Sequence, residues 1–389
     1  MVITPFFPFI MSIPLHIFGN NEIIVQIENV LVMIFTLYII EKLINKKIYL
    51  IILFLVFPLS LMFPSYNLML FELLVMILYC EKNIDNNDLI LGILVGLMIL
   101  TKQNVGLIIV IVLILSQIKN KKRIIKRLIG LIIPITILLL YLIINKALYN
   151  FVDQCFLGLF EFGGENKRID LISLISIIYL AIIIHFIRKN PKKIENYYIL
   201  AFFGIELPMA DLYHTQIFNL AFLIAILLNI DIKKEKEKLI NISSIILIIS
   251  SQIIMFSNLE KPIIYPNNIN HFEYRYIKKS NVDFANEIKD YINQNKEEKI
   301  IFLVYDAYFI KTFSDKKIDK LDLINYGNSG KNGTKKNIEL IKKNKDAIFI
   351  INEDDLKIKG QIDIETIKYI KEKGKKIGNL RIYSIYKLE

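Results

Sequence analysis

Residues 89–110 read LILGILVGLMILTKQNVGLIIV, in which the polar tetrapeptide TKQN (101–104) separates two apolar half-runs. Apolar blocks of this kind recur through the first 256 residues of the 389-residue chain. The whole sequence is 54% hydrophobic and has a mean hydropathy of +0.47, which is far too apolar for a soluble protein of this length. Since about 17–25 apolar residues cross a bilayer as a helix, the sequence predicts a polytopic α-helical membrane protein.

About ten transmembrane helices are expected. They are predicted at 23–43, 48–63, 66–80, 88–101, 104–118, 128–145, 170–187, 196–210, 214–229 and 239–256. If these spans alternate, four basic loops fall on one side of the membrane, at 41–47, 119–127, 188–193 and 231–238. Lys and Arg collect in cytoplasmic loops, so this side is predicted to be the cytoplasm, with the acidic loop at 81–88 as an exception. We therefore expect a multi-pass protein of the plasma membrane.

The composition changes after residue 256, which predicts a transmembrane domain over 1–256 and a soluble α/β domain over 257–389. Segments rich in β-branched and aromatic residues predict strands at 299–306, 346–354 and 380–388. Amphipathic helices are predicted at 281–295, 334–344 and 364–374. In the first of these helices, one face carries Val282, Ala285, Ile288 and Ile292. The parity of the spans places this domain outside the cytoplasm.

The net charge of +11 is not interpreted as a sign of nucleic-acid binding, because a membrane protein carries basic inner loops in any case. Nucleic acid is therefore not an expected partner, whereas membrane lipids are. Cys80 and Cys155 are predicted on opposite faces of the membrane, so they indicate neither a disulfide nor a metal site.

The predicted outer face holds most of the candidate functional residues. Lys102 lies at membrane depth or at its rim, where a charge is costly unless it is paired or hydrated. It is a candidate to bind a phosphate or pyrophosphate group, and the alternative is a lysine that snorkels from a helix end. Asp211 and His214 are three residues apart and could share a hydrogen bond on one helix face. Such a pair can fix the tautomer of the ring or support proton transfer; the alternative is an interfacial polar turn at Pro208.

Other polar groups are weaker candidates. The loop 146–169 carries Asp153 and Arg168, and Arg168 could hold a lipid phosphate through two hydrogen bonds or form a solvated loop end. Glu28 and Glu72 are acids inside predicted spans, where a carboxyl group indicates a functional site by default. The alternatives are a position of Glu28 near the membrane interface and a protonated Glu72 that is hydrogen-bonded to a neighbouring helix. The segment NYGNSGKNGT (325–334) lacks the spacing of a phosphate-binding loop and is interpreted as a plain flexible loop.

Two stretches together resemble the GT-C superfamily of integral-membrane glycosyltransferases, which includes protein O-mannosyltransferases and aminoarabinose transferases. The segment TPFFPFIMSIPLHIFGN (4–20) is similar to a proline-led apolar stretch that ends in Phe-Gly, here Phe18-Gly19, and leads into a helix. The segment 89–110 is similar to the Gly-rich helix that ends in Thr-Lys, here Thr101-Lys102. The resemblance covers the layout of residues 1–230.

The resemblance implies transfer of a sugar from a polyprenyl-phosphate donor to a lipid, glycan or protein acceptor on the extracytoplasmic face. The lipid-linked sugar is then the expected partner; no other cofactor is assigned, and a divalent metal is left open. Lys102, His214 and Arg168 are the candidates for binding the phosphate. In the family the catalytic acid lies in an outer loop after a first helix, and we expect this chain to begin after that point. Asp211 or Asp153 would then have to act as the base.

Two alternatives stand beside the transferase. A truncated, non-catalytic family member or accessory subunit, bound to a membrane partner protein, would explain the missing acidic loop. A lipid or solute transporter would place Glu28 and Glu72 around one central cavity, although the sequence shows no internal repeat of the kind that many transporters contain.

Overall fold

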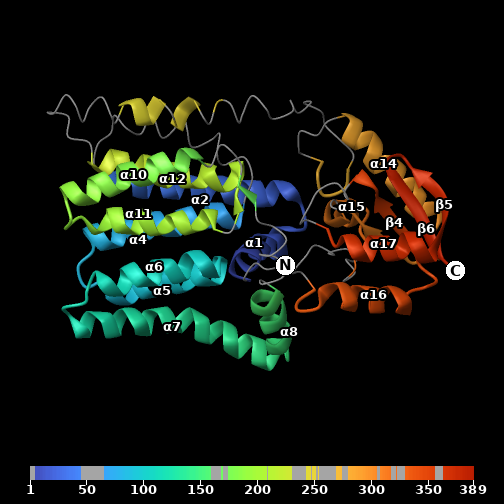
Figure 1. Ribbon diagram of the computed structural model, residues 1–389, viewed down its shortest axis with the longest axis horizontal. Coiled ribbons are helices and arrows are strands. Elements are labelled where there is room, and N and C mark those ends of the chain that lie inside the picture. The colour runs from blue at the N-terminus through green and yellow to red at the C-terminus, as the bar shows by residue number, and fades with distance from the viewer. Residues whose placement is uncertain are drawn as a thin grey trace.

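A computed structural model shows the chain as a helical bundle with an α/β unit at one end of it (Figure 1). The structure describes residues 5–44, 65–158, 168–169, 174–207, 209–229, 242–246, 248–250, 253, 269–273, 279–304, 307–316, 321, 329–354 and 362–389. The expected span at 48–63 and most of the span at 239–256 lie outside the described residues.

The bundle is built from long helices that lie side by side (Figure 1). In chain order they are α2 (Glu22–Ile44), α4 (Tyr66–Asn83), α5 (Asp88–Thr101), α6 (Gln103–Leu115), α7 (Lys121–Ile144), α10 (Leu174–Lys189), α11 (Ile194–Phe202) and α12 (Leu212–Asn229). Shorter elements cap the bundle at the end that faces the α/β unit: α1 (Phe6–Phe18), α8 (Leu148–Val152), the π-helical turn η1 (Asp153–Leu157) and the 3-10 turn η3 (Phe203–Glu206).

The prediction of a polytopic protein with about ten transmembrane helices is wrong. Helices form at the expected spans within the described residues, but only α2 and α7 are long and apolar enough to cross a membrane. The other helices are too short or too charged. α5 has 14 residues and therefore rises about 21 Å, less than the roughly 30 Å of hydrocarbon in a bilayer. α4 has 18 residues but carries three charged side chains, Glu72, Glu81 and Lys82.

The two long apolar helices leave much of their surface uncovered. Only 22% of the apolar window of each helix is buried, so neither is the core helix of the bundle. The exposed large side chains include Ile27, Leu31, Ile34 and Phe35 on α2 and Ile129, Ile132, Ile137 and Leu140 on α7. Contiguous apolar surface of this kind marks a contact with lipid or with another protein.

α5 and α7 approach each other through glycines. A Cβ atom at Gly92 of α5 would lie 2.0 Å from the carbonyl oxygen of Arg127, and one at Gly130 of α7 would lie 2.1 Å from that of Leu89. Gly96, one turn after Gly92, has the ring of Pro134 against it. Small residues four apart allow two helix backbones to pack this closely, so the Gly-rich pattern of the sequence serves helix packing here.

The α/β unit contains a four-stranded sheet in the order β3-β4-β6-β5. β3 (Ile300–Leu303) and β4 (Ile348–Asn352) are parallel, and β6 (Tyr383–Leu388) is antiparallel to both β4 and β5 (Gly374–Leu380). α14 (Lys279–Gln294) and α15 (Ala307–Phe313) pack on one face of the sheet. α16 (Gly333–Lys343) and α17 (Ile364–Lys373) pack on the other.

The sequence predictions for this unit are confirmed at the level of the individual elements. The three predicted strands correspond to β3, β4 and β6, and the three predicted helices to α14, α16 and α17. Val282, Ala285, Ile288 and Ile292 are all buried beneath α14. The edge strand β5 was missed, because its sequence GKKIGNL is polar and all of its residues are partly or fully exposed. Lysines on an edge strand discourage pairing with other chains.

Among the described residues, hydrogen bonds join the α/β unit to the bundle in two places. In the first, the turn between α1 and α2 meets residues 269–273: Glu22 N–H donates to His271 O at 2.9 Å, and Asn21 Nδ2 donates to Glu273 Oε2 at 2.9 Å. In the second, η1 meets the loop before α16, where Lys331 N–H donates to Asp153 Oδ1 at 3.1 Å. We call the end of the bundle that carries Lys102, Asp153 and Asp211 the near end, and the end that carries Asp88 and Arg127 the far end.

Candidate functional site

Lys102 stands at the break between α5 and α6. Its backbone is extended, with φ −155° and ψ 108°, so it ends one helix and begins the next. Its N–H still donates to Met98 O, and the Thr101 hydroxyl donates to Leu97 O. The polar tetrapeptide of the sequence therefore forms the corner of a helical hairpin at the near end of the bundle.

The ammonium group of Lys102 is held by neutral groups. Nζ donates to Ile205 O at 3.1 Å and to Asn67 Oδ1 at 3.4 Å, and it lies 5.6 Å from the centre of the Tyr66 ring. Among the described residues it forms no ion pair. Lys102 lies outside α2 and α7, and burial lowers the pKa of its ammonium to about 7, while the nearby charge of Asp211 acts in the opposite direction.

Asp211 and His214 form the hydrogen-bonded pair that their spacing predicts. Asp211 Oδ1 accepts the backbone N–H of His214 at 2.9 Å and lies 2.7 Å from Nδ1 of its ring. Asp211 directly precedes α12, so its carboxylate caps the first turn of this helix. Burial lowers the pKa of His214, which favours a neutral ring. In that state Nδ1–H donates to Asp211 and leaves Nε2 as the proton acceptor.

Lys102, Asp211 and His214 lie near one another at the near end. The charge of Lys102 acts on His214 and the charge of Asp211 acts on Lys102, so the three groups share one electrostatic environment. Arg168 belongs to the short strand β1 (Arg168–Ile169), which pairs in parallel with β2 (Met209–Ala210). Its backbone partner is Met209, two residues before Asp211. The structure thus brings the Arg168 backbone next to the Lys102–Asp211–His214 cluster.

Sequence reasoning gave no role to several side chains that complete this cluster. Glu206 of η3 is buried and accepts a hydrogen bond from Ser176 Oγ at 2.5 Å. Burial raises the pKa of Glu206 to about 7. Tyr213 lies beside His214, with the two rings 5.8 Å apart, and burial raises the pKa of its hydroxyl group. Glu206 and Tyr213 lie in the same polar segment as His214, which was the available signal; Ser176 lies in an apolar run 30 positions earlier and gave none.

Asp153 does not join the Lys102 cluster and lies instead at the second contact with the α/β unit. Its residue exposure is 7%, and Lys336 Nζ lies 2.6 Å from Oδ2. Gly330 has a φ of +75°, and a Cβ atom there would lie 2.0 Å from the same oxygen. Residues 329–333 of the segment interpreted as a plain flexible loop therefore wrap around the carboxylate of Asp153.

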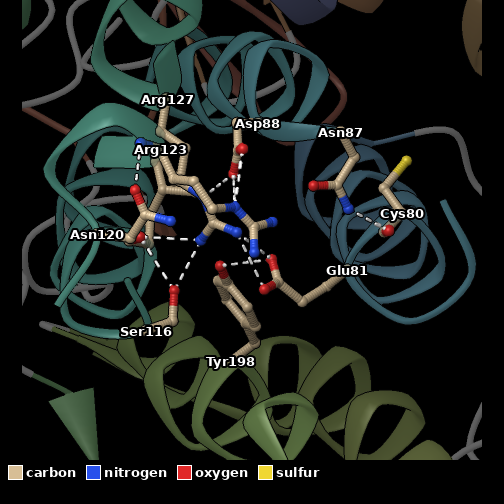
Figure 2. A network of polar contacts seen from close by, with 10 residues as sticks. Cys80, Glu81, Asn87, Asp88, Ser116, Asn120, Arg123, Arg127 and Tyr198 are labelled. Carbon is tan, nitrogen blue, oxygen red and sulfur yellow. Dashed lines mark hydrogen bonds and ion pairs between the residues drawn. The ribbon is translucent and has the colours of Figure 1, made fainter. Parts of the chain in front are cut away.

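The far end carries a second polar network, shown in Figure 2. Arg127 is fully buried, and its guanidinium donates to Asp88 Oδ1 at 2.8 Å, to both oxygens of Glu81 at 3.0 and 3.1 Å, and to Leu113 O and Ser116 Oγ. Arg123 adds a second contact to Asp88. All five N–H donors of Arg127 are thus used inside the protein. The acidic loop at 81–88 neutralises arginines of the basic loop beside it.

Metal ligands do not gather at either end: among the described residues no group of three or more His, Cys, Asp or Glu could hold a metal ion. Cys80 and Cys155 are both buried and free. No protein-family model matches the chain, and neither a curated protein nor a solved structure is significantly similar to it.

Proposed function

We propose that this protein is a membrane-associated glycosyltransferase that uses a sugar carried on a polyprenyl phosphate. The observation that carries the proposal is Lys102, a partly buried ammonium at the near end that contacts neutral oxygens and forms no ion pair among the described residues. A buried charge is costly without a counter-charge. Asp211 lies near Lys102 but is paired with His214. An incoming phosphate would supply a direct counter-charge, and the Thr-Lys resemblance points to the same residue.

The proposed chemistry needs a group that stabilises the leaving phosphate. When the bond between the anomeric carbon and the phosphate oxygen breaks, the electron pair stays on the phosphate, whose charge grows. Lys102 would meet this charge by exchanging its contact with Ile205 O for the phosphate. The backbone strand of Arg168 lies beside the same cluster, so its guanidinium is the proposed second cation.

The proposed chemistry also needs a base for the acceptor hydroxyl. His214 Nε2 takes the proton while the acceptor oxygen forms the new bond to the anomeric carbon, and Asp211 holds the ring through Nδ1. Asp211 is therefore a positioning residue, and Asp153, whose carboxylate is paired with Lys336, is left out of the reaction. The resemblance to the GT-C superfamily made His214 a candidate for binding phosphate. Its role as the base is proposed here from its hydrogen bond to Asp211.

Membrane association of the protein is supported by α2 and α7, whose apolar surfaces are largely uncovered. Both helices are long enough to cross a bilayer, and a lipid-linked donor would reach the near end from the membrane. The proposal assigns spanning positions to these two helices alone.

The test is a transfer assay with the full chain in vesicles that contain a radiolabelled polyprenyl-phospho-sugar. Lys102→Ala should lower transfer at least 100-fold, since one electrostatic contact to a developing charge contributes roughly that factor. The matched control is Lys126→Ala, which removes an exposed lysine at the far end and should leave transfer unchanged. Donor binding with no transfer in the wild-type chain would instead favour the non-catalytic accessory subunit.

A further inference from the structure

Two acidic residues, Glu28 on α2 and Glu72 on α4, lie near each other in the bundle. Glu72 of α4 has an exposure of only 6%, and the carboxyl of Glu28 on α2 lies close enough for the two groups to repel each other. Neither group belongs to the Lys102 cluster, and the proposed transfer uses neither of them.

Glu72 lines a small pocket that opens between α1, α2 and α4. The pocket measures about 30 Å³, which is room for one or two water-sized occupants. Its wall contains no cationic side chain and consists of Phe7, Ile10, Met11, Asn29, Val32, Ser65, Leu68, Met69 and Glu72. The pocket therefore combines an apolar wall with one buried acid.

The two carboxyl groups lack partners within the part of the chain that the structure describes. Glu72 forms no hydrogen bond or ion pair there, and Oε2 of Glu28 is buried without a hydrogen-bond partner. A buried carboxylate without compensation is costly, and two nearby carboxylates add their repulsion to that cost. Among the described residues no protein group supplies this compensation, and a small ligand in the pocket could supply it.

We propose that the pocket lined by Glu72, with the charge of Glu28 nearby, binds one monovalent cation, with Na⁺ as the best fit. Carboxylate, amide and hydroxyl oxygens are the ligands of hard cations, and the pocket offers these through Glu72, Asn29 and Ser65. Its small volume excludes an organic ammonium group that is attached to a lipid or sugar. The pocket wall supplies one carboxylate, that of Glu72, and no second acid or histidine, so its charge matches a monovalent ion better than a divalent or transition-metal ion.

The site is independent of the proposed transferase but connected to it through α4. Tyr66 and Asn67 at the start of α4 contact Lys102, and Glu72 follows about 9 Å further along the helix axis. A cation between α2 and α4 would hold the α4 terminus in place. Its loss should therefore lower stability even if the chain has no transferase activity.

The test follows thermal unfolding of the full chain in detergent micelles, in chloride salts of Na⁺, K⁺ or choline at one ionic strength and one pH. The unfolding midpoint should rise saturably with Na⁺, by roughly 5 °C at one hundred times the dissociation constant, and less with K⁺. Glu72→Gln should abolish the Na⁺-dependent rise, whatever its own baseline stability. Asp85→Asn, which removes an exposed acid at the far end, is the control and should keep the rise.

Several outcomes would overturn the proposal. They are an equal rise in choline, a rise that persists in Glu72→Gln, stabilisation by Mg²⁺ or Ca²⁺ alone, and a midpoint that responds only to pH, which would indicate a shared proton instead of a cation. If Glu72→Gln does not fold, the proposal can be tested by equilibrium dialysis with radioactive Na⁺. The dialysis compares the wild-type chain with Glu28→Gln. The proposal requires one bound ion per wild-type chain and at least tenfold weaker binding in the variant.

Discussion

Asp211 Oδ1 lies 2.7 Å from Nδ1 of His214 and also accepts the backbone N–H of the same residue. One carboxylate therefore caps α12 and orients the ring that the proposed mechanism uses as a base. The two tasks can be separated by substitution, because asparagine is as good a helix cap as aspartate but carries no charge.

Asp211→Asn should fold like the wild type but lose most of its transfer activity. We expect a 100- to 10,000-fold fall in the transfer rate, the range that general base catalysis contributes, with an unfolding free energy close to that of the wild type. Asp211→Ala should lose the same rate and also about 1 kcal/mol of stability, because the cap is gone. Rates and denaturant unfolding of the two variants check this. A normal transfer rate in Asp211→Asn would show that His214 does not act as the base.

Donor binding should weaken as the pH rises through 7. Since burial lowers the pKa of Lys102 to about 7, its ammonium is mostly charged at pH 6 and mostly neutral at pH 8. A phosphodiester donor keeps one negative charge over this range, so its affinity should fall about tenfold between these pH values. Glu206, whose pKa is raised to about 7, becomes negatively charged over the same pH range. Its charge repels the phosphate and therefore also weakens donor binding as the pH rises.

The pH dependence separates the two groups when it is measured in variants. Lys102→Met should give weak binding with a much smaller pH dependence, which then comes from Glu206 alone, and Glu206→Gln should retain the part that Lys102 contributes. Binding can be followed by equilibrium dialysis of a labelled donor into micelles that contain the protein. An unchanged pH profile in Lys102→Met would show that the ammonium does not meet the phosphate.

Because Arg127 holds the far-end network together, its substitution should strongly destabilise the protein. Arg127→Lys keeps the charge but replaces five planar donors by three, so Glu81, Asp88 or the Leu113 carbonyl loses its partner. We expect a loss of about 3–5 kcal/mol, as when one partner of a buried ion pair is removed. Lys126→Arg, at the exposed neighbouring position, should change stability by less than about 0.5 kcal/mol. Denaturant unfolding of both variants tests this, and similar stabilities would refute it.

Substitution of Gly92 should also destabilise the protein, for a steric reason. An added methyl group would lie 2.0 Å from the backbone oxygen of Arg127, and a backbone atom cannot rotate away as a side chain can. Gly92→Ala should therefore push α5 and α7 apart at a cost of roughly 1–3 kcal/mol or more. Ile90→Ala, on an exposed site two residues earlier, serves as the control. A stable Gly92→Ala variant would mean that the helices are not in contact at this glycine.

The sequence predicted the local elements much better than it predicted their relation to a membrane. Apolar blocks marked the positions of helices because burial in a bundle and burial in lipid require the same side chains. Length and charge separate the two cases, and α5, with 14 residues, and α4, with three charged residues, fail on those grounds. In the α/β unit, runs of β-branched and aromatic residues located β3, β4 and β6, and the helical period located the four buried residues of α14, but the polar edge strand β5 was not predicted.

The candidate site was predictable only where its residues are close in the sequence. Asp211 and His214 are three positions apart, and helix geometry brings them together. The contacts of Lys102 with Asn67 and Ile205 join residues 35 and 103 positions away, and no local pattern encodes such pairs. The same limit explains Asp153, whose partner Lys336 lies in the other unit, 183 positions later.

Photo-cross-linking can show whether the donor phosphate binds at Lys102, beside His214, at the near end of the bundle. A polyprenyl phosphate with a photoreactive group next to the phosphate is bound to the full chain in vesicles, irradiated, and mapped by mass spectrometry. We predict labels at Tyr66 or Asn67, at 102–104 and at 205–214, which an excess of unlabelled donor removes. Labels confined to the exposed faces of α2 and α7, or labels unaffected by competitor, would contradict the account.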